Sequence, residues 1–226
     1  MATFVSALTI IVLAGLLNTN LTFMTDNAAL FSLFYLPPIA FFTELIGHKN
    51  NFLIEQKEHY PKQTYRNRAQ IYSPDGALTL VVPVAKGAKN HRVVRDVKIS
   101  YDFNWQRLHW MGLQNCYRSS AYFEYYEAEF APFYQGKKYE FLFDYNEALL
   151  HLLLKLLKLK LELKYNEAYE ADFAGADFRK SIHPKLEYHF EQKTYFQVFD
   201  DRQGFLKNLS IVDLLFNQGP NAVKYL

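Results

Sequence analysis

The sequence predicts an α/β fold in which a mixed sheet begins with an N-terminal βαβ-like unit and is covered by helices; an α+β arrangement is the alternative. Two patterns support this prediction. A strand, a helix and a second strand follow one another within residues 28–55, and helical periodicity dominates residues 104–158. The chain has 226 residues, of which 50% are hydrophobic and 21% are charged, as is typical of one globular domain.

The N-terminal segment differs from the rest of the chain. Its apolar run, residues 5–17, is too short for a membrane span, and it lacks the preceding lysine or arginine that a signal peptide requires. We interpret residues 1–23 as an upstream extension from a misassigned start codon, with a membrane anchor as the alternative. Residues 24–226 would then form a single domain.

The βαβ-like unit comes first within this domain. The apolar segment that begins at Ala28 predicts a buried strand, which ends at two consecutive prolines because proline cannot donate to a strand ladder. Apolar residues of 39–46 recur at helical spacing, and a glycine follows them, as is typical of a helix end. Residues 51–55 predict the second strand. The carboxyl ends of both strands would then meet where open α/β sheets bind ligands.

A hairpin is expected next. Residues 65–72 and 78–84 flank the sequence Ser73-Pro-Asp-Gly, in which proline presets φ and glycine accepts a positive φ. Residues 86–91 predict a basic, glycine-containing loop, and the alternation over residues 93–99 predicts a further strand.

The helical half of the chain follows. A helix is predicted over residues 104–117, with an asparagine that can cap it, and aromatic-rich helical segments continue over residues 119–132. The sequence Asp144-Tyr-Asn-Glu matches a capping box for a helix over residues 148–157. Leucines at every second position then predict a strand over residues 159–165.

The last quarter of the chain has weaker patterns. Residues 169–186 are polar and predict a loop. A short strand is expected at Tyr195, and a helix capped by Asn208-Leu-Ser210 is expected to run to Phe216, where Gly219-Pro220 stops it.

Composition and missing motifs exclude several classes of protein. The formal charge is only +2, with acidic and basic residues interspersed, so a nucleic-acid-binding protein is not predicted. The one cysteine, Cys116, excludes an intrachain disulfide, fits a reducing cytoplasm and is expected to be a core residue. P-loop, dinucleotide-fingerprint, nucleophile-elbow and paired-cysteine motifs are absent from the sequence, so no cofactor is predicted.

A metal site is not predicted either. The order of Glu55, Glu58 and His59 resembles only a rearranged zinc-protease motif, and Pro61 interrupts the helix that such a motif needs.

The polar stretch from Glu55 to Arg68 is the predicted functional site. Carboxylates, cations and aromatic side chains gather there between apolar segments, as they do where a rigid scaffold presents a site. In a strand, Arg66 and Arg68 would share one face, where their guanidiniums and Lys62 suit a phosphate or carboxylate. The alternative is a surface ladder in which these cations pair with Glu55 and Glu58.

Two histidines are candidate bases, because imidazole exchanges protons near neutral pH. His59 lies in the polar stretch, and His109 lies in the helix of residues 104–117, where a packed core histidine is the alternative. The candidate residues for binding donor and substrate are Tyr35, Lys62, Gln63, Tyr65, Arg66, Asn67, Arg68 and Trp105.

A series of motifs in this order resembles the WbqC-like family of bacterial proteins. These motifs are Tyr35-Leu-Pro-Pro with Phe41-Phe42, Lys62-Gln-Thr-Tyr-Arg-Asn-Arg68, Leu78-Thr-Leu-Val-Val-Pro-Val84, Trp105 with His109-Trp110 and Tyr117, Tyr195-Phe-Gln-Val-Phe199, and the block from Gly204 to Pro220. The resemblance covers residues 28–226. Many members carry a Gln-Pro pair ahead of the Tyr-Leu-Pro segment; this chain has Leu33-Phe34 there, so no role of that glutamine carries over.

The resemblance implies a bacterial protein of surface-polysaccharide (O-antigen type) biosynthesis, and a cytoplasmic transferase of acyl or aminoacyl type that acts on an amino sugar nucleotide. Its partners would be a small-molecule donor and a sugar-type acceptor, with no nucleic acid and no membrane beyond a possible N-terminal anchor. A non-catalytic scaffold or binding protein within a biosynthetic complex is the alternative, with the aromatic helices of residues 122–134 as its partner surface. A membrane-anchored protein is a third hypothesis, which depends on residues 1–23 alone.

Overall fold

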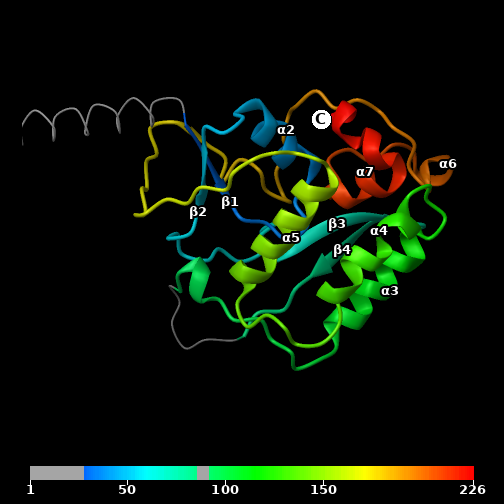
Figure 1. The fold of residues 1–226 in the computed structure, drawn as a ribbon, viewed down its shortest axis with the longest axis horizontal. Helices are drawn as coiled ribbons and strands as arrows, with labels where there is room; N and C mark the ends of the chain where they lie inside the picture. Colours follow the sequence, from blue (N-terminus) through cyan, green and yellow to red (C-terminus); the bar gives the residue numbers. More distant parts are fainter. Residues whose placement is uncertain (1–27, 86–91) are drawn as a thin grey trace, which may run out of the picture.

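The structure, a computed structural model, describes residues 28–85 and 92–226. The expected N-terminal extension, residues 1–23, and the expected basic loop, residues 86–91, lie outside the described residues. Helices and strands are mixed along the described chain, in agreement with the predicted α/β class or its α+β alternative (Figure 1).

The N-terminal βαβ unit is confirmed. Strand β1 (Ala29–Ser32) leads through helix α2 (Ile39–Gly47) to strand β2 (Phe52–Glu55). The two strands pair in parallel, with Ala29 opposite Phe52 and Ser32 opposite Glu55. All four residues of β1 are buried, as expected for a strand that is covered on both faces.

A third strand, β5 (Ala176–Asp177), pairs in parallel with the other side of β1, so the order of the sheet is β2-β1-β5. Residues 169–186 were predicted to be a loop, and a strand of two residues is too short to leave a periodic pattern. The chain approaches β1 closely here, because a Cβ atom on Gly175 would lie 2.0 Å from the backbone oxygen of Ala28. A residue without a side chain is therefore needed at this position.

The predicted hairpin forms a separate antiparallel pair, strand β3 (Arg68–Ser73) with strand β4 (Gly76–Val81). Gly76 has a φ of 103°, which explains the glycine at the turn. Helix α3 (Trp105–Tyr117) and helix α7 (Ile211–Gln218) pack against β3.

The helices that follow the hairpin agree with most of the predictions. Asn104 caps α3 as expected, because its side chain accepts a hydrogen bond from the backbone nitrogen of Arg107 at 3.2 Å. The remaining helices are α4 (Phe123–Phe130), η2 (Ala131–Phe133), α5 (Leu142–Leu156), α6 (Asp200–Gln203), α7 and η3 (Gly219–Tyr225). Figure 1 shows α3 and α4 beyond the hairpin, and α2 and α7 together beside the C-terminus.

Two local predictions in the middle of the chain were wrong. Helix α5 begins at Leu142, so Asp144 lies in the first turn and is not a cap. Residues 93–99 form a short 3₁₀ helix, η1 (Val94–Asp96), instead of a strand. Isolated bridges to three separate segments hold the flanks of η1, so no single ladder forms.

Two strand predictions in the later chain were also wrong. Residues 159–165 do alternate between half-buried leucines and exposed polar residues. They form one isolated bridge with β2, between Tyr165 and Ile54, instead of a ladder. Near Tyr195, the side-chain amide of Gln197 forms two hydrogen bonds with the backbone of Leu206. It accepts from the nitrogen at 2.8 Å and donates to the oxygen at 3.0 Å. These side-chain bonds replace the ladder that a strand would need.

The core is aromatic. Phe31 of β1 packs edge-on against Phe41 and Phe52 and stacks on Phe178, with ring centroids 4.7 to 6.2 Å apart. Within residues 28–85 and 92–226, no helix is both long and apolar enough to cross a membrane.

Candidate functional site

A buried network of charged side chains lies at the carboxyl end of the parallel sheet. The network begins with Arg66, which is 2% exposed. Its guanidinium donates to both carboxylate oxygens of Glu58, from Nε and from Nη2, each at 2.7 Å. Nη2 also donates to the hydroxyl of Ser32, the last residue of β1, and that hydroxyl donates to Glu58 at 2.9 Å.

Arg179 supplies the other half of the network. Its Nη1 lies 2.9 Å from a carboxylate oxygen of Glu55, the last residue of β2, and its Nη2 lies 2.6 Å from Asp177, the last residue of β5. Asn166 donates to the second oxygen of Glu55 at 2.6 Å. Burial raises the pKa of Asp177, but hydrogen bonds from Arg179 outweigh that effect and hold the pKa below its usual value. Each of these buried charges therefore has an opposite charge beside it.

This network changes the interpretation of the predicted anion site. The guanidinium of Arg66 is committed to Glu58, in a buried pair and not in a surface ladder. Arg68 lies in β3, and its Nε is buried without a hydrogen-bond partner. Because Glu58 already neutralises Arg66, a phosphate would have to displace a carboxylate to bind there.

Four of the other predicted residues from the polar stretch lie apart from this network. His59 is exposed and forms an isolated bridge with Val93. Lys62 and Gln63 are exposed, and Gln63 accepts a hydrogen bond from Lys185 at 2.5 Å. The side chain of Asn67 is buried and donates to the backbone oxygen of Val82 at 2.9 Å.

Three predicted residues from distant parts of the chain do come together: Tyr35, Trp105 and His109. The hydroxyl of Tyr35 lies 3.0 Å from Nδ1 of His109 and 3.0 Å from the hydroxyl of Tyr134. The rings of Trp105 and His109 are 5.0 Å apart. Tyr65 supports the group through its backbone, because its carbonyl accepts from the nitrogen of Tyr35 at 2.9 Å.

The protonation state of His109 determines which group donates and which accepts in these hydrogen bonds. Burial lowers the pKa of His109 to about 4, against a smaller opposing effect of a hydrogen bond with the backbone of Val81. A backbone bond that favours the protonated ring is one that the ring donates, so we assign the ring proton to Nε2, facing Val81. Nδ1 then accepts from Tyr35, and the oxygen of Tyr35 accepts from Tyr134. The oxygen of Tyr134, which also interacts with the hydroxyl of Tyr145, has two lone pairs and so keeps one with which it can accept a proton.

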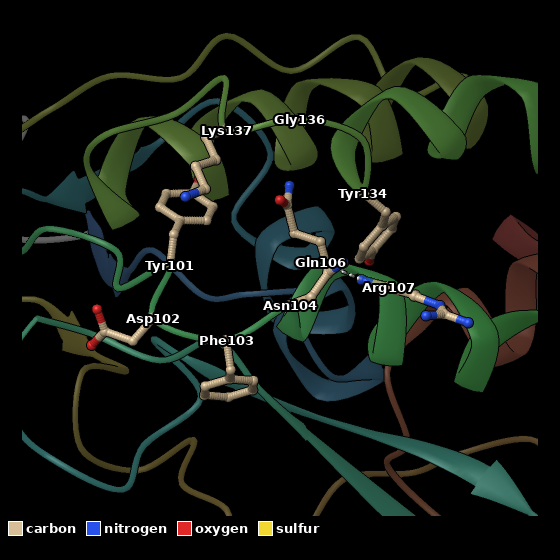
Figure 2. A pocket seen from close by; sticks show the side chains of 9 residues that line it. All are labelled: Tyr101, Asp102, Phe103, Asn104, Gln106, Arg107, Tyr134, Gly136 and Lys137. Carbon is tan, nitrogen blue, oxygen red and sulfur yellow. Dashed lines mark hydrogen bonds between the residues drawn. The ribbon is translucent and has the colours of Figure 1, made fainter.

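Tyr134 lines a cavity of about 420 Å³ beside α3 (Figure 2). The other lining residues are Tyr101, Asp102, Phe103, Asn104, Gln106, Arg107, Gly136 and Lys137. Figure 2 shows Tyr101 and Lys137 on one side of the cavity, Tyr134 on the other, and Gln106 between them. This volume is in the range of small-molecule sites.

The lining of the cavity combines aromatic faces, amides and positive charge. Lys137 and Arg107 supply two cations, Asp102 supplies one carboxylate, and the ammonium of Lys137 lies 5.7 Å from the ring of Tyr101. Gln106 is buried, and its Nε2 donates to the backbone oxygen of Phe133 at 3.0 Å, which fixes the amide. Such a lining suits a small polar ligand that carries an anionic group.

No motif in the sequence pointed to the cavity. Tyr134 lies in the aromatic-rich span of residues 122–134, which was considered only as a partner surface under the scaffold alternative, and Lys137 follows in a glycine-containing turn. Tyr65 lines a smaller cavity of about 220 Å³ instead, between β3 and residues 184–190. Within residues 28–85 and 92–226, no three His, Cys, Asp or Glu side chains are grouped so that they could hold a metal ion.

Comparison with known proteins identifies the family. A family model described as "WbqC-like protein family" matches residues 34–178, more than half of the chain. The chain belongs to the WbqC-like family. The matched segment includes every site residue predicted from the sequence, from Tyr35 to His109. Of the buried charge network, Ser32 and Arg179 lie just outside the matched segment.

One curated relative extends the likeness over most of the chain. It is a Mycobacterium tuberculosis protein described as "Uncharacterized protein Rv1507c". The two are 27% identical over an alignment of 221 residues, which covers 85% of this chain and 94% of the relative. No solved structure matches the chain.

Proposed function

We propose that this WbqC-like protein is a transferase that moves an acyl- or aminoacyl-type group from an activated donor to a sugar-type acceptor, and that the cavity beside α3 is its active site. The observation that supports this proposal is the hydrogen-bonded series from Tyr134, at the wall of the cavity, through Tyr35 to the neutral ring of His109. A buried neutral base joined to a ligand-sized cavity is an arrangement suited to proton transfer.

The chemistry follows from the direction of the series. An acceptor hydroxyl in the cavity would donate its proton to the oxygen of Tyr134 as it attacks the donor carbonyl. Tyr134 would pass its own proton to Tyr35, and Tyr35 would pass its proton to Nδ1 of His109. Because the pKa of His109 is only about 4, the imidazolium is short-lived, and the proton returns along the same series to the leaving group.

Lys137 and Arg107 would hold the anionic part of the donor at the mouth of the cavity. This role was predicted for Arg66, Arg68 and Lys62. We assign it to the cavity cations because Arg66 is already paired with Glu58. The network around Arg66 and Arg179 would instead fix the ends of β1, β2 and β5, and thereby the segment that carries Tyr35.

The cellular role that we propose is surface-polysaccharide biosynthesis in the bacterial cytoplasm. The support for this role is membership of the WbqC-like family and the resemblance of the motifs. A cavity lined by aromatic rings and amides also agrees with a sugar-type substrate.

The test is a thermal-shift screen of the full chain against nucleotide sugars, acyl-CoA compounds and aminoacyl donors. A ligand that binds the native state raises its stability with concentration. We expect a rise in melting temperature with the donor that binds. Lys137→Gln should reduce this rise, whereas a matched change of an exposed lysine outside the cavity, Lys160→Gln, should leave it unchanged.

Each donor that binds is then incubated with amino-sugar acceptors, and the product is followed by mass spectrometry. Binding without any transfer would contradict the proposal.

A non-catalytic binding protein is the second candidate, because α3 exposes apolar side chains. Leu108 is 60% exposed and Met111 is 42% exposed, three positions apart on one helix, and Phe103 just before the helix is 54% exposed. In the span of residues 122–134, by contrast, Tyr125 is exposed while Phe123 and Phe130 are buried. Recovery of a partner by the full chain that Leu108→Lys abolishes, with no donor binding, would favour this candidate.

A further inference from the structure

A second, smaller cavity of about 220 Å³ lies between β3 and residues 184–190, and the proposed transfer reaction does not use it. Its size limits its ligands. Sites for drug-sized molecules and cofactors have volumes of about 300–1,000 Å³. The second cavity therefore has room for a single small ring, and not for a whole nucleotide or coenzyme.

Tyr65 places an unpartnered hydroxyl at the second cavity. The residue is only 4% exposed, and burial raises the pKa of its phenol to about 12. Within residues 28–85 and 92–226 this hydroxyl forms no hydrogen bond. A ligand in the cavity can reach it, since the fully enclosed atoms without partners do not include it. The ring itself is fixed, because it packs against Phe34 with centroids 5.8 Å apart.

Two amide side chains line the same cavity. Gln70 is half-buried, and its side chain has no hydrogen-bond partner in the part of the chain that the structure describes. Its backbone oxygen accepts from the nitrogen of Ser210 at 2.7 Å, which holds this part of β3 in place. Asn208 directs its Oδ1 to the backbone nitrogen of Ala40, at 2.9 Å, and so keeps Nδ2 as a donor. With Tyr65, these amides offer donors and acceptors that are all uncharged.

Two aromatic rings form another wall of the second cavity. The rings of Tyr188 and Phe190 have centroids 6.0 Å apart and are inclined at 47°. The hydroxyl of Tyr188 donates to Glu44 of α2 at 2.9 Å, which anchors this wall. Aromatic faces of this kind pack well against the C–H face of a sugar. Because the two rings are inclined to each other, they form no parallel slot for a flat base.

The charged side chains of the second cavity lie at its rim. Lys207 and Glu187 are exposed and opposite in charge, and His189 is exposed as well. Water screens such charges, so they add little affinity for an anion or a cation. An anionic ligand would meet no buried cation in this lining. A sugar hydroxyl, which both donates and accepts, matches the uncharged groups of Tyr65 and Gln70.

We propose that the second cavity binds one uncharged sugar ring, with its hydroxyls hydrogen-bonded to Tyr65 and Gln70 and its apolar face against Tyr188 and Phe190. The site is separate from the cavity beside α3, because the two cavities share no lining residue. This inference does not rest on the proposed function, since none of its four residues donates or accepts a proton in the proposed transfer.

The experiment measures binding to the full chain by saturation-transfer difference NMR. The probes are N-acetylglucosamine, galactose and mannose, each titrated alone, with uridine as a probe for a flat base. We expect at least one of the sugars to bind. The largest signals should come from the ring C–H protons that lie against Tyr188 and Phe190.

Variants locate the bound sugar. Tyr65→Phe and Gln70→Leu should each weaken binding about five- to ten-fold, the effect of one hydrogen bond between uncharged groups. Tyr65→Phe should leave the denaturant midpoint unchanged, because its hydroxyl has no partner among the described residues. Tyr125→Phe, at a residue that is 79% exposed, and Lys137→Gln, in the other cavity, should leave sugar binding unchanged.

Three results would overturn the inference, and each differs from a failure of the proposed function. Absence of binding by all three sugars, or binding that survives both Tyr65→Phe and Gln70→Leu, would exclude the second cavity as a sugar site. Sugar binding that only Lys137→Gln weakens would place the sugar beside α3, so the inference would fail and the proposed active site would stand. Binding of uridine alone, weakened by Tyr65→Phe, would show that the class of ligand is wrong.

Discussion

The hydroxyl of Tyr35 lies 3.0 Å from Nδ1 of His109, although the two residues are 74 positions apart in the chain. Tyr35 follows the first strand of the parallel sheet, and His109 lies in the middle of α3, which packs against the hairpin. One hydrogen bond therefore connects the segment that follows β1 to α3, next to Tyr134 at the wall of the cavity beside α3.

Removal of this bond should destabilise the protein. We expect Tyr35→Phe to lower the free energy of unfolding by about 1–3 kcal/mol, because it leaves Nδ1 of His109 buried without a donor. Urea denaturation followed by circular dichroism measures this change. Tyr125→Phe is the control, since Tyr125 is 79% exposed; equal effects of the two variants would count against the hydrogen bond.

Breaking the buried charge network should cost more. Arg179→Met leaves the carboxylate of Glu55 buried without its cation, and we expect a loss of about 3–5 kcal/mol. Lys98→Met breaks the exposed pair with Glu140 and should cost less than about 1 kcal/mol, because water screens that pair. Denaturant midpoints of both variants test this difference, and a mild effect of Arg179→Met would mean that water reaches the network.

The close approach of β5 to β1 should make Gly175 intolerant of substitution. Gly175→Ala places a Cβ atom 2.0 Å from the oxygen of Ala28, a distance that requires the backbone to move, so we expect a loss of more than about 2 kcal/mol. Gly47→Ala, which has nothing within 4 Å, should be neutral. Thermal melting compares the two, and a tolerated Gly175→Ala would contradict the pairing of β5 described here.

His109 and Asp213 should affect the pH dependence of the free energy of unfolding in opposite directions. Between about pH 4 and pH 6, the contribution of His109 should rise with pH and that of Asp213 should fall. Burial raises the pKa of Asp213 to about 6, although hydrogen bonds from Tyr195, Tyr117 and Gln197 act against it. Its contribution to stability is present below about pH 4 and is lost as the pH rises to about 6, a change of about 3 kcal/mol. The pKa of His109 is lowered to about 4, so its contribution is present above about pH 6.5 and is lost by a similar amount as the pH falls to about 4.

The two variants separate these contributions. Relative to the unmodified chain, His109→Gln should be most destabilising at pH 7 and least at pH 4.5, whereas Asp213→Asn should show the reverse trend. Free energies of unfolding at several pH values measure both. Parallel curves for the two variants would mean that at least one of these side chains does not titrate as its burial requires.

The parts of the fold that were predicted from the sequence are those with local patterns. The βαβ unit, the hairpin at Ser73-Pro-Asp-Gly and the cap at Asn104 each follow from hydrophobic periodicity and turn chemistry within a few residues. Strand β5 was missed because two residues carry no period, and the strand expected over residues 159–165 failed because its alternation has no ladder partner.

Several residues of the candidate site were likewise predicted individually, but their spatial arrangement was not. Tyr35, Trp105 and His109 were each selected from the sequence, but their meeting depends on how α3 packs, which no local pattern reports. Arg66 was selected as an anion-binding residue, and its partner Glu58 was considered only as a surface alternative, because burial is a property of the folded chain. Tyr134 and Lys137 carried no chemical motif at all.

We propose that Tyr134, Tyr35 and His109 act as one proton path. A double-mutant comparison tests this proposal directly. The single-turnover rate of transfer is measured for the full chain, for Tyr134→Phe, for His109→Gln and for the double variant, with the donor that the screen identifies. We expect each single variant to lower the rate about 10²–10⁴-fold and the double variant to be no slower than the slower single variant, because all members of one path act as a unit. Full activity in either single variant, or losses that multiply in the double variant, would contradict it.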